Sequence, residues 1–457
     1  MAMKIPKSGW RWQREALRFT AALILMLAFG VGGAYAGRDP LRACFWVGPI
    51  STAQPDAVPD FDGRAFNFPE EAATYWFARF SVPAGARLVL KGRYARARYQ
   101  SLNAYDPAGG GSIDSLPDYL IEPDGGAANP FVAGNVRKRG GYRVEIVDQV
   151  RPVDSALRAP NTLYASTGAS RPREILYRVY VPDAGRDLAG DSGLPKPILV
   201  MADGSRLRGE ALCNAINDAD RTVPLQPLPA VLWQAFANMA GGDPATHPAF
   251  EPPLWERFFS LAFAATDFWI GTPLEPNRAN ASYAETGGLY ANLDIRYVYA
   301  HLSRRYGPVL VLRGKLPTYP TTENGQPVMG TGQLRYWSIC QIESRVTLRT
   351  VDCLADHQVT IDAERNDTIV VSRPEDRPAN AQPECGVTWL DWGPNGDAAG
   401  RPDYGLIVIR NMLPAPDFAE AAQNVTMPGI ERDVMGPYLP TASYTTTTDF
   451  DALGCGG

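Results

Sequence analysis

The sequence predicts a mainly β protein with two tandem, internally duplicated β-sandwich or jelly-roll-like domains and a helical connector. Three observations lead to this fold class. The 457 residues include 43 Gly and 40 Pro, and only 20% are charged, which favours strands and turns over long helices. Short runs rich in Val, Ile, Tyr, Phe and Leu alternate with turn residues, as in sandwiches. The second half of the chain also repeats the first.

The repeat consists of three blocks in the same order. Residues 75–92 match 297–314 at a constant offset of 222, with 8 of 18 positions identical. After an insertion of 15 residues in the second copy, residues 98–102 match 335–339. A third block, residues 178–182, recurs at an offset of 232. Self-similarity at so long a period indicates duplicated domains, because the repeats of a solenoid are far shorter.

The first 36 residues have the pattern of an export signal. An uncharged run over residues 19–37 contains the small-x-small pattern of residues 34–36. The basic residues ahead of it are Lys4, Lys7, Arg11, Arg14 and Arg18. We predict cleavage after Ala36 and a secreted or periplasmic mature protein. The alternative is an uncleaved membrane anchor, because an uncharged run of this length nearly suffices to cross a bilayer.

The mature chain is acidic. Residues 1–36 contribute a net charge of +4, so the chain without them carries −9 instead of −5. A surface of this sign repels phosphates, and we therefore expect no nucleic-acid partner. Contact with a membrane is expected only through the leader, if it stays uncleaved.

The chain after the leader divides into three parts. We place the first β domain at residues 37–204, the helical connector at 205–285 and the second β domain at 286–457. In the connector, residues 228–240 carry apolar side chains at helical spacing, and residues 253–270 form a long aromatic segment that also indicates a helix.

The predicted export indicates that the cysteines form structural disulfides. Their number is even, and disulfides persist in oxidising compartments. No C-x-x-C occurs, so the sequence supports neither a zinc ribbon nor a thioredoxin-like site. A bridge between the two first-half cysteines is one of the pairings that remain open. The disulfide candidates are Cys44, Cys213, Cys340, Cys353, Cys385 and Cys455.

The best candidates for a ligand site lie in the repeated blocks. Alternate residues of a strand share a face, which places Tyr99, Ser101 and Asn103 together. Aromatic, hydroxyl and amide groups suit a glycan or another polar small molecule. The first-domain candidates are Arg98, Tyr99, Ser101, Asn103, Asp106, Arg178 and Tyr180, and their second-copy equivalents are Arg335, Tyr336, Ser338, Glu343 and Arg410. The alternative is that these hydroxyl groups bond to the backbone inside a sandwich.

Two further features leave alternatives open. Arg178 and Arg410 occupy matched positions and could clamp a carboxylate or phosphate, or pair with Asp106 and Glu343 to lock each lobe. The face of the first copy is polar where the second is partly apolar, so we expect a polar cavity in the first lobe and a structural second lobe. The Gly-rich loop over residues 391–397 could hold Ca²⁺ but is more typical of a turn.

Catalytic and cofactor motifs are absent from the sequence. It contains no G-x-S-x-G elbow, phosphate loop or dinucleotide fingerprint. The three His give little material for a metal centre, and each is more readily explained as structural. We therefore predict no cofactor and no metal, and we identify no catalytic residue.

The repeated blocks carry a resemblance to known proteins. Residues 92–106, 175–190, 332–344 and 404–418 resemble exported bacterial proteins of unknown function with tandem β domains. In those families an Arg-Tyr-x-Ser-Leu strand is followed by an Arg-x-Tyr-x-Pro strand. The resemblance implies the architecture and carries no catalytic residues.

Two functional hypotheses follow. The first is an exported bilobed protein that binds a polar small molecule or glycan, or has a structural role in the cell envelope. The alternative is a secreted hydrolase or lyase with a polar cleft in the first β domain, near Arg98, Tyr99, Ser101, Asp106 and Arg178.

Overall fold

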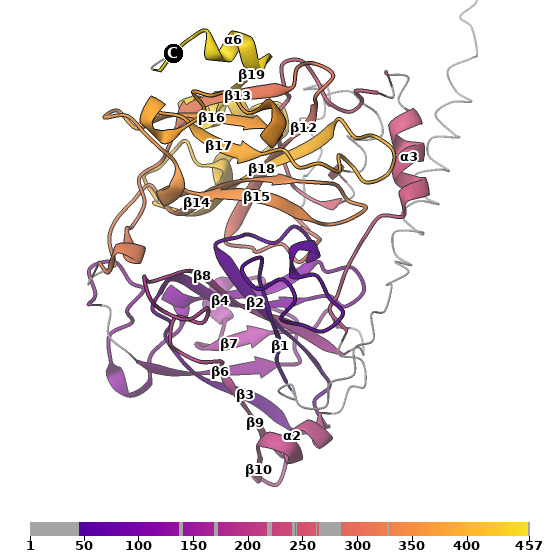
Figure 1. Cartoon of the computed structure of the whole chain (residues 1–457). Helices are drawn as coiled ribbons and strands as arrows, with labels where there is room; N and C mark the ends of the chain where they lie inside the picture. The colour runs from indigo at the N-terminus through magenta and orange to yellow at the C-terminus, as the bar shows by residue number, and fades with distance from the viewer. Residues whose placement is uncertain are drawn as a thin grey trace, which may run out of the picture.

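The computed structural model describes residues 45–136, 140–168, 172–216, 222–239, 243, 245–261, 263–264, 285–326 and 329–455. The predicted leader lies outside these residues. Within them, no helix is both long and apolar enough to cross a membrane. Figure 1 shows two stacked lobes, the first drawn in indigo to magenta and the second in orange to yellow.

The first lobe is a sandwich of two sheets. One sheet has the order β1 (Val47–Ile50), β2 (Ala73–Phe80), β8 (Arg173–Pro182), β4 (Ala97–Tyr105) and β5 (Ser112–Pro117). The other has the order β10 (Arg206–Leu207), β9 (Lys196–Val200), β3 (Arg87–Arg93), β6 (Gly141–Val147) and β7 (Thr162–Tyr164). Side chains from both sheets form one buried core, which includes Leu88 and Tyr177.

The second lobe has the same plan. One sheet has the order β11 (Glu256–Arg257), β12 (Ile295–Ser303), β18 (Tyr404–Pro414), β14 (Leu334–Ile342) and β15 (Thr350–Ala355). The other has the order β17 (Thr388–Asp391), β16 (Asn366–Ser372), β13 (Val309–Lys315) and β19 (Thr441–Thr445). Its core includes Leu310 and Ile409.

Strand order and register confirm that the lobes are duplicates. Each sandwich contains one parallel strand pair at the same place: β7 pairs with β6 in the first lobe, and β17 pairs with β16 in the second. Tyr75 lies opposite Arg178 in the first lobe, and Tyr297 lies opposite Arg410 in the second. The mainly β fold with two duplicated sandwiches is therefore as the sequence predicts.

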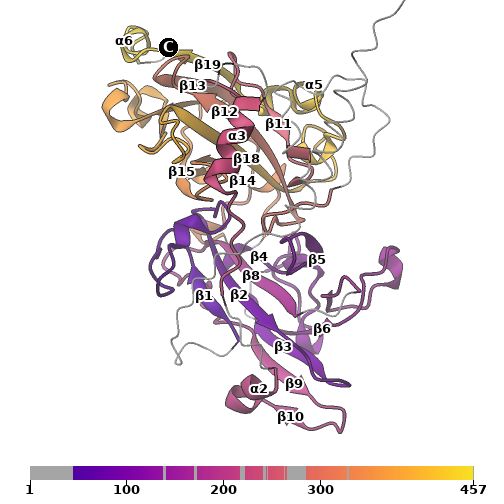
Figure 2. The same cartoon turned by 90° about the vertical axis from the view of Figure 1, so that its right-hand side faces the viewer.

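The described part of the connector contains both helical and extended segments. Its described α-helices include α2 (Gly209–Ala215) and α3 (Ala230–Met239), and Figure 2 shows α3 over the second lobe. The segment at 253–270 does not begin as a helix, because residues 256–257 form β11 and pair with β12. Residues 261, 263 and 264 are helical, and 265–270 lie outside the described residues.

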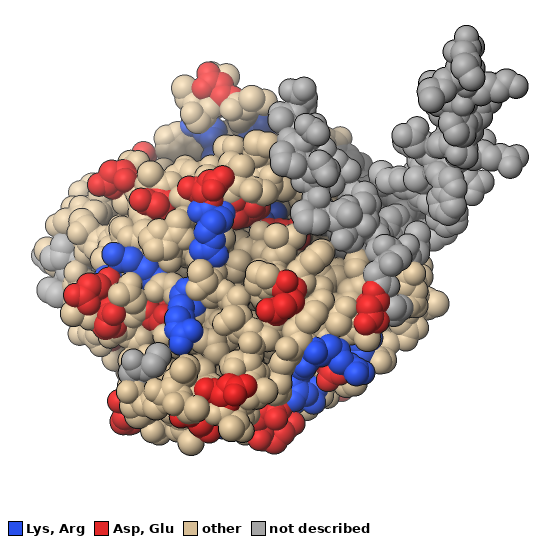
Figure 3. Space-filling view, turned by 90° about the horizontal axis from the view of Figure 1, so that it is seen from above, with Lys and Arg blue, Asp and Glu red and all other residues tan. Residues whose placement is uncertain are grey.

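Short helices complete the described chain. The α-helices are α5 (Glu431–Met435) and α6 (Thr447–Asp451). The 3₁₀ turns are η1 (Gly63–Ala65), η2 (Asp118–Leu120), η3 (Asp124–Gly126), η4 (Ser155–Leu157), η6 (Thr322–Asn324), η7 (Asp356–Gln358), η8 (Pro374–Asp376), η9 (Pro383–Cys385), η10 (Ala422–Asn424) and η11 (Gly436–Tyr438). On the face in Figure 3, acidic and basic side chains are interspersed, with no extended area of one sign.

The described cysteines are paired. Cys340 bonds to Cys353 across β14 and β15, and Cys385 bonds to Cys455 near the C-terminus. Cys213 is also disulfide-bonded, while Cys44 lies outside the described residues. Disulfides are typical of oxidising compartments, which agrees with the expected export.

Candidate functional site

The polar faces of β4 and β14 lie between the two lobes. The Tyr99 hydroxyl donates to Asp294 Oδ2 at 2.5 Å, and burial, together with this carboxylate, raises the pKa of Tyr99 well above its usual value. Ser101 Oγ donates to Asn103 Oδ1 at 2.7 Å, and Asn103 Nδ2 donates to Ser115 Oγ at 2.9 Å. These buried groups are therefore hydrogen-bonded to the protein itself.

The two matched arginines exchange contacts between the lobes. Arg178 donates from Nη1 to Asn103 Oδ1 at 2.6 Å and from Nη2 to the Tyr290 carbonyl at 2.5 Å. Arg410 donates from Nη2 to the Phe68 carbonyl at 3.0 Å and pairs through Nη1 with Glu70 at 3.0 Å. Phe68 precedes β2 and Tyr290 precedes β12 at the repeat offset of 222. Each lobe thus supplies a carbonyl to the arginine of the other.

This arrangement differs from the pairing that the sequence left open. Arg178 does not bond to Asp106, whose Oδ1 accepts from the Ala108 amide at 2.9 Å. Arg410 does not pair with Glu343, whose Oε1 accepts from Asn395 Nδ2 at 2.8 Å. The arginines instead join the lobes to each other, because each donates to a backbone carbonyl of the opposite lobe.

A second exchange involves Arg98 and Arg335. Arg98 pairs through Nη1 with Asp356 at 2.5 Å and through Nη2 with Glu323 at 2.5 Å. Arg335 pairs through Nη1 with Asp118 at 3.1 Å. Burial raises the pKa of Asp118 to about 6, although the charge of Arg335 opposes that shift. These pairs again join opposite lobes, so Arg98 and Arg335 are engaged within the protein.

The remaining candidates are also buried between the lobes. Ser338 Oγ donates to Glu70 Oε2 at 2.5 Å. The rings of Tyr180 and Tyr336 meet edge to face, with centroids 5.5 Å apart. Of all the sequence-predicted candidates, only Arg178, Tyr180 and Arg410 border the cavity described next.

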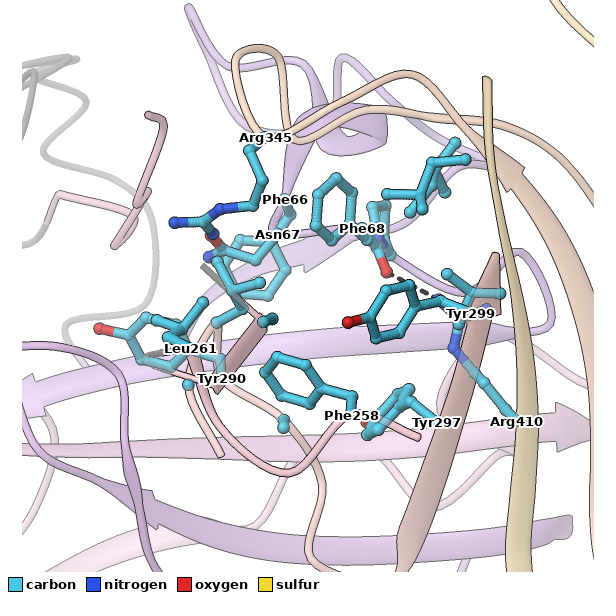
Figure 4. A pocket seen from close by; sticks show the side chains of 18 of the residues that line it. Phe66, Asn67, Phe68, Phe258, Leu261, Tyr290, Tyr297, Tyr299, Arg345 and Arg410 are labelled. Carbon is cyan, nitrogen blue, oxygen red and sulfur yellow. Dashed lines mark hydrogen bonds between the residues drawn. The ribbon is translucent and has the colours of Figure 1, made fainter. Parts of the chain in front are cut away.

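A cavity of about 180 Å³ lies beside this interface (Figure 4). Its lining is largely aromatic. The first lobe contributes Phe66, Phe68, Tyr75 and Tyr180. The connector and second lobe contribute Trp233, Phe258, Tyr290, Tyr297 and Tyr299. The cavity therefore combines rings from both lobes with rings from the connector.

The first lobe fills the equivalent space. There the Tyr290 hydroxyl donates to Glu174 Oε2 at 2.7 Å, Glu174 pairs with Arg79 at 3.2 Å, and the Tyr290 ring lies 4.9 Å from that of Tyr105. The register places Leu406, His301 and Ile342 at the positions of Glu174, Arg79 and Tyr105. All three line the cavity. The second lobe therefore has smaller or apolar residues at these three positions, and the space that is filled in the first lobe stays open there.

This outcome differs from the expected polar cavity in the first lobe. The polar face of β4 is covered by the second lobe, so it presents no open surface at Tyr99, Ser101 or Asn103. The open volume instead lies between the lobes, beside β12 and β18 of the second lobe, and its lining is largely aromatic and apolar.

His301 is a poor candidate for acid–base chemistry. Burial lowers the pKa of His301 to about 3, with Arg401 and His247 adding to the effect. Its Nδ1 hydrogen-bonds to the Tyr404 hydroxyl at 2.9 Å. The ring therefore stays neutral at physiological pH and cannot provide a base matched to that pH.

The 391–397 loop is held by protein donors. Asp397 accepts from the Trp233 indole at 2.7 Å, from the Ala399 amide at 2.9 Å and from Arg401 Nε at 2.7 Å. These donors occupy the carboxylate that would have to face a calcium ion, so the loop acts as a structured turn.

Sequence reasoning missed most of the lining. Tyr297, Tyr299 and His301 belong to the repeated block at 297–314, and the rule that placed Tyr99 and Ser101 on one face places these three together as well. No comparable sequence signal was available for Arg345 or Phe258, which reach the cavity from a turn and from the connector.

Among known proteins, the chain matches solved structures only. No family model and no curated protein matches the chain. An uncharacterised protein from Burkholderia cenocepacia is similar over 97% of this chain and 92% of its own, with 14% identity and a TM-score of 0.46. A protein from Vibrio parahaemolyticus is similar over 83% of this chain and 90% of its own, with 11% identity and a TM-score of 0.35. These similarities add no residue role to the site.

Proposed function

We propose that this is an exported, non-catalytic binding protein that takes a small, largely aromatic molecule into the interlobe cavity. The observation that carries the proposal is the asymmetry between the lobes. The second lobe keeps a ring-lined volume open at the place where the first lobe buries Tyr290 against Tyr105.

The chemistry of the lining supports an aromatic ligand. Ring pairs in offset or edge-to-face geometry add about 0.5–1.5 kcal/mol each beyond the burial of apolar area. Ligand sites are typically concave and mostly apolar, with a few polar groups that fix orientation. The polar small molecule or glycan that the sequence favoured is less well served, since the polar groups of β4 and β14 bond to the protein.

A hydrolase or lyase is the weaker candidate. Arg98, Tyr99 and Ser101 are buried among protein partners, and Arg178 is the one member of that proposed cleft which borders the cavity. The neutral imidazole of His301 offers no matched base. A binding role requires none of these groups to react.

The test is calorimetric titration with indole, a neutral aromatic probe. Ile342→Tyr places in the second lobe the residue that fills the equivalent position of the first lobe, so it should weaken indole binding at least about tenfold with the melting temperature preserved. Val153→Tyr is the matched control, because Val153 is fully exposed (104%) and outside the lining.

Two results would contradict the proposal. One is the absence of saturable indole binding by the wild-type protein. The other is equal affinity of the wild type and Ile342→Tyr, which would place the bound probe elsewhere.

A further inference from the structure

The cavity carries positive charge only. Among the described residues that line it are Arg178, Arg345 and Arg410, and none is Asp, Glu or Lys. In a partly enclosed, largely apolar space the attraction between opposite charges is stronger than in water. The lining therefore favours a negatively charged guest over a neutral or positive one.

The three arginines differ in how they are engaged. Arg178 donates to Asn103 and to the Tyr290 carbonyl, and Arg410 is paired with Glu70. The side chain of Arg345 makes no hydrogen bond or ion pair within the described structure, and its Nη1 is shielded from solvent without a partner. Arg345 is thus the guanidinium that remains available to a ligand.

The backbone holds Arg345 in place at the cavity. Its carbonyl accepts from the Leu228 amide at 2.8 Å, which ties the turn after β14 to the connector. In Figure 4, Arg345 and Arg410 lie on opposite sides of the cavity. A ligand could therefore reach Arg345 with one end while its ring lies among the aromatic residues.

An unpaired guanidinium in such a place is costly to the protein. Burial lowers the pKa of Arg345 to about 10, so the group stays protonated at neutral pH. Arg345 is half-buried, with Nη1 shielded from solvent, and a shielded charge without a partner destabilises a fold. Binding of an anion reduces that penalty.

We propose that Arg345 is the anion-recognition residue of this cavity and that the ligand is a small aromatic carboxylate. This inference rests on the proposed function. A single free guanidinium presents a planar fork that matches one carboxylate, and its one positive charge balances a carboxylate but only half of a phosphate dianion.

The experiment compares three probes by calorimetric titration: indole, indole-3-acetate and its neutral isostere indole-3-acetamide. The wild type should bind the acetate about 10- to 100-fold more tightly than the acetamide, as expected for a charge-assisted hydrogen bond. Arg345→Gln should abolish this preference, so that the variant binds the acetate and the acetamide with equal affinity. A cooperative melting transition of Arg345→Gln, measured separately, shows that the variant is folded.

Two controls separate recognition from net charge. Arg313→Gln removes one charge from an exposed residue outside the lining and should keep the full preference. Arg345→Lys keeps the charge without the fork and should keep only part of it.

The outcomes are distinguishable from those of the proposed function. Equal binding of acetate and acetamide by the wild type, or an undiminished preference in Arg345→Gln, would overturn the carboxylate inference even if indole binds. Failure of indole itself to bind would count against the cavity as a site.

Discussion

At the scale of single residues, Asp367 is a buried carboxyl group without a cation beside it. It lies in β16, 8% exposed, and has no ion pair in the described structure. Burial, reinforced by Asp362, raises the pKa of Asp367 from 3.8 to about 7. The folded state therefore holds this proton more tightly than the unfolded chain, and the free energy of unfolding falls as pH rises from about 4 to 7.

Asp367→Asn should remove that pH dependence. At pH 8 the variant should be more stable than the wild type by about 2–4 kcal/mol, and near pH 4 the two should be nearly equal. Urea unfolding at pH 4, 6 and 8 measures this. A difference in stability that is the same at pH 4 and pH 8 would refute the explanation. The exposed Glu375→Gln is the control for losing one carboxylate.

At the scale of elements, one strand pair is held differently in the two lobes. Cys340 and Cys353 form a disulfide at the position where Asn103 and Ser115 form a hydrogen bond. The arginine next to each pair donates to the equivalent residue in its own lobe: Arg178 donates to Asn103 Oδ1, and Arg410 donates to Cys340 Sγ. The two pairs are therefore alternative solutions at one site of the duplicated sheet.

The double variant Cys340→Asn/Cys353→Ser should fold with the first-lobe pairing. It should lose about 2–3 kcal/mol in guanidinium unfolding, as expected for opening a loop of 13 residues. Cys340→Ala/Cys353→Ala should lose more, because Arg410 is then left with a missing acceptor. Equal stability of the two double variants would show that the Arg410 contact is unimportant.

Sequence periodicity predicted which residues share a face of a strand better than it predicted what packs against that face. The period of two placed Tyr99, Ser101 and Asn103 on one face, and the structure agrees. It could not indicate that the second lobe covers this face, because that depends on contacts between segments far apart in the chain. The segment at 256–257 shows the same limit: its aromatic surroundings indicated a helix, but pairing with β12 makes it a strand.

At the scale of the whole molecule, the lobes are joined by reciprocal contacts. Arg98 pairs with Asp356, and Arg335 pairs with Asp118. Arg178 and Arg410 each donate a hydrogen bond to a carbonyl of the opposite lobe. A third apolar cluster, with Phe77 and Met412 among its members, draws on both lobes. Such an interface couples the folding of the two sandwiches.

We therefore expect one calorimetric unfolding transition for the full chain. Arg98→Met should shift that whole transition downwards, by about 3–5 kcal/mol in unfolding free energy, because the buried Asp356 loses its arginine. Arg98→Met/Asp356→Asn should recover part of the loss, and the exposed Arg313→Met is the control. Two separate transitions in the wild type would contradict the coupling.

Because Tyr290 fills the first-lobe space, it limits the number of ligand molecules that one chain can bind. A symmetric dimer of identical subunits would offer two equal sites, whose occupancy could be cooperative. In the fused chain the first-lobe position is permanently occupied by a side chain of the protein itself. Titrations should thus end at one ligand per chain, with a Hill coefficient of one.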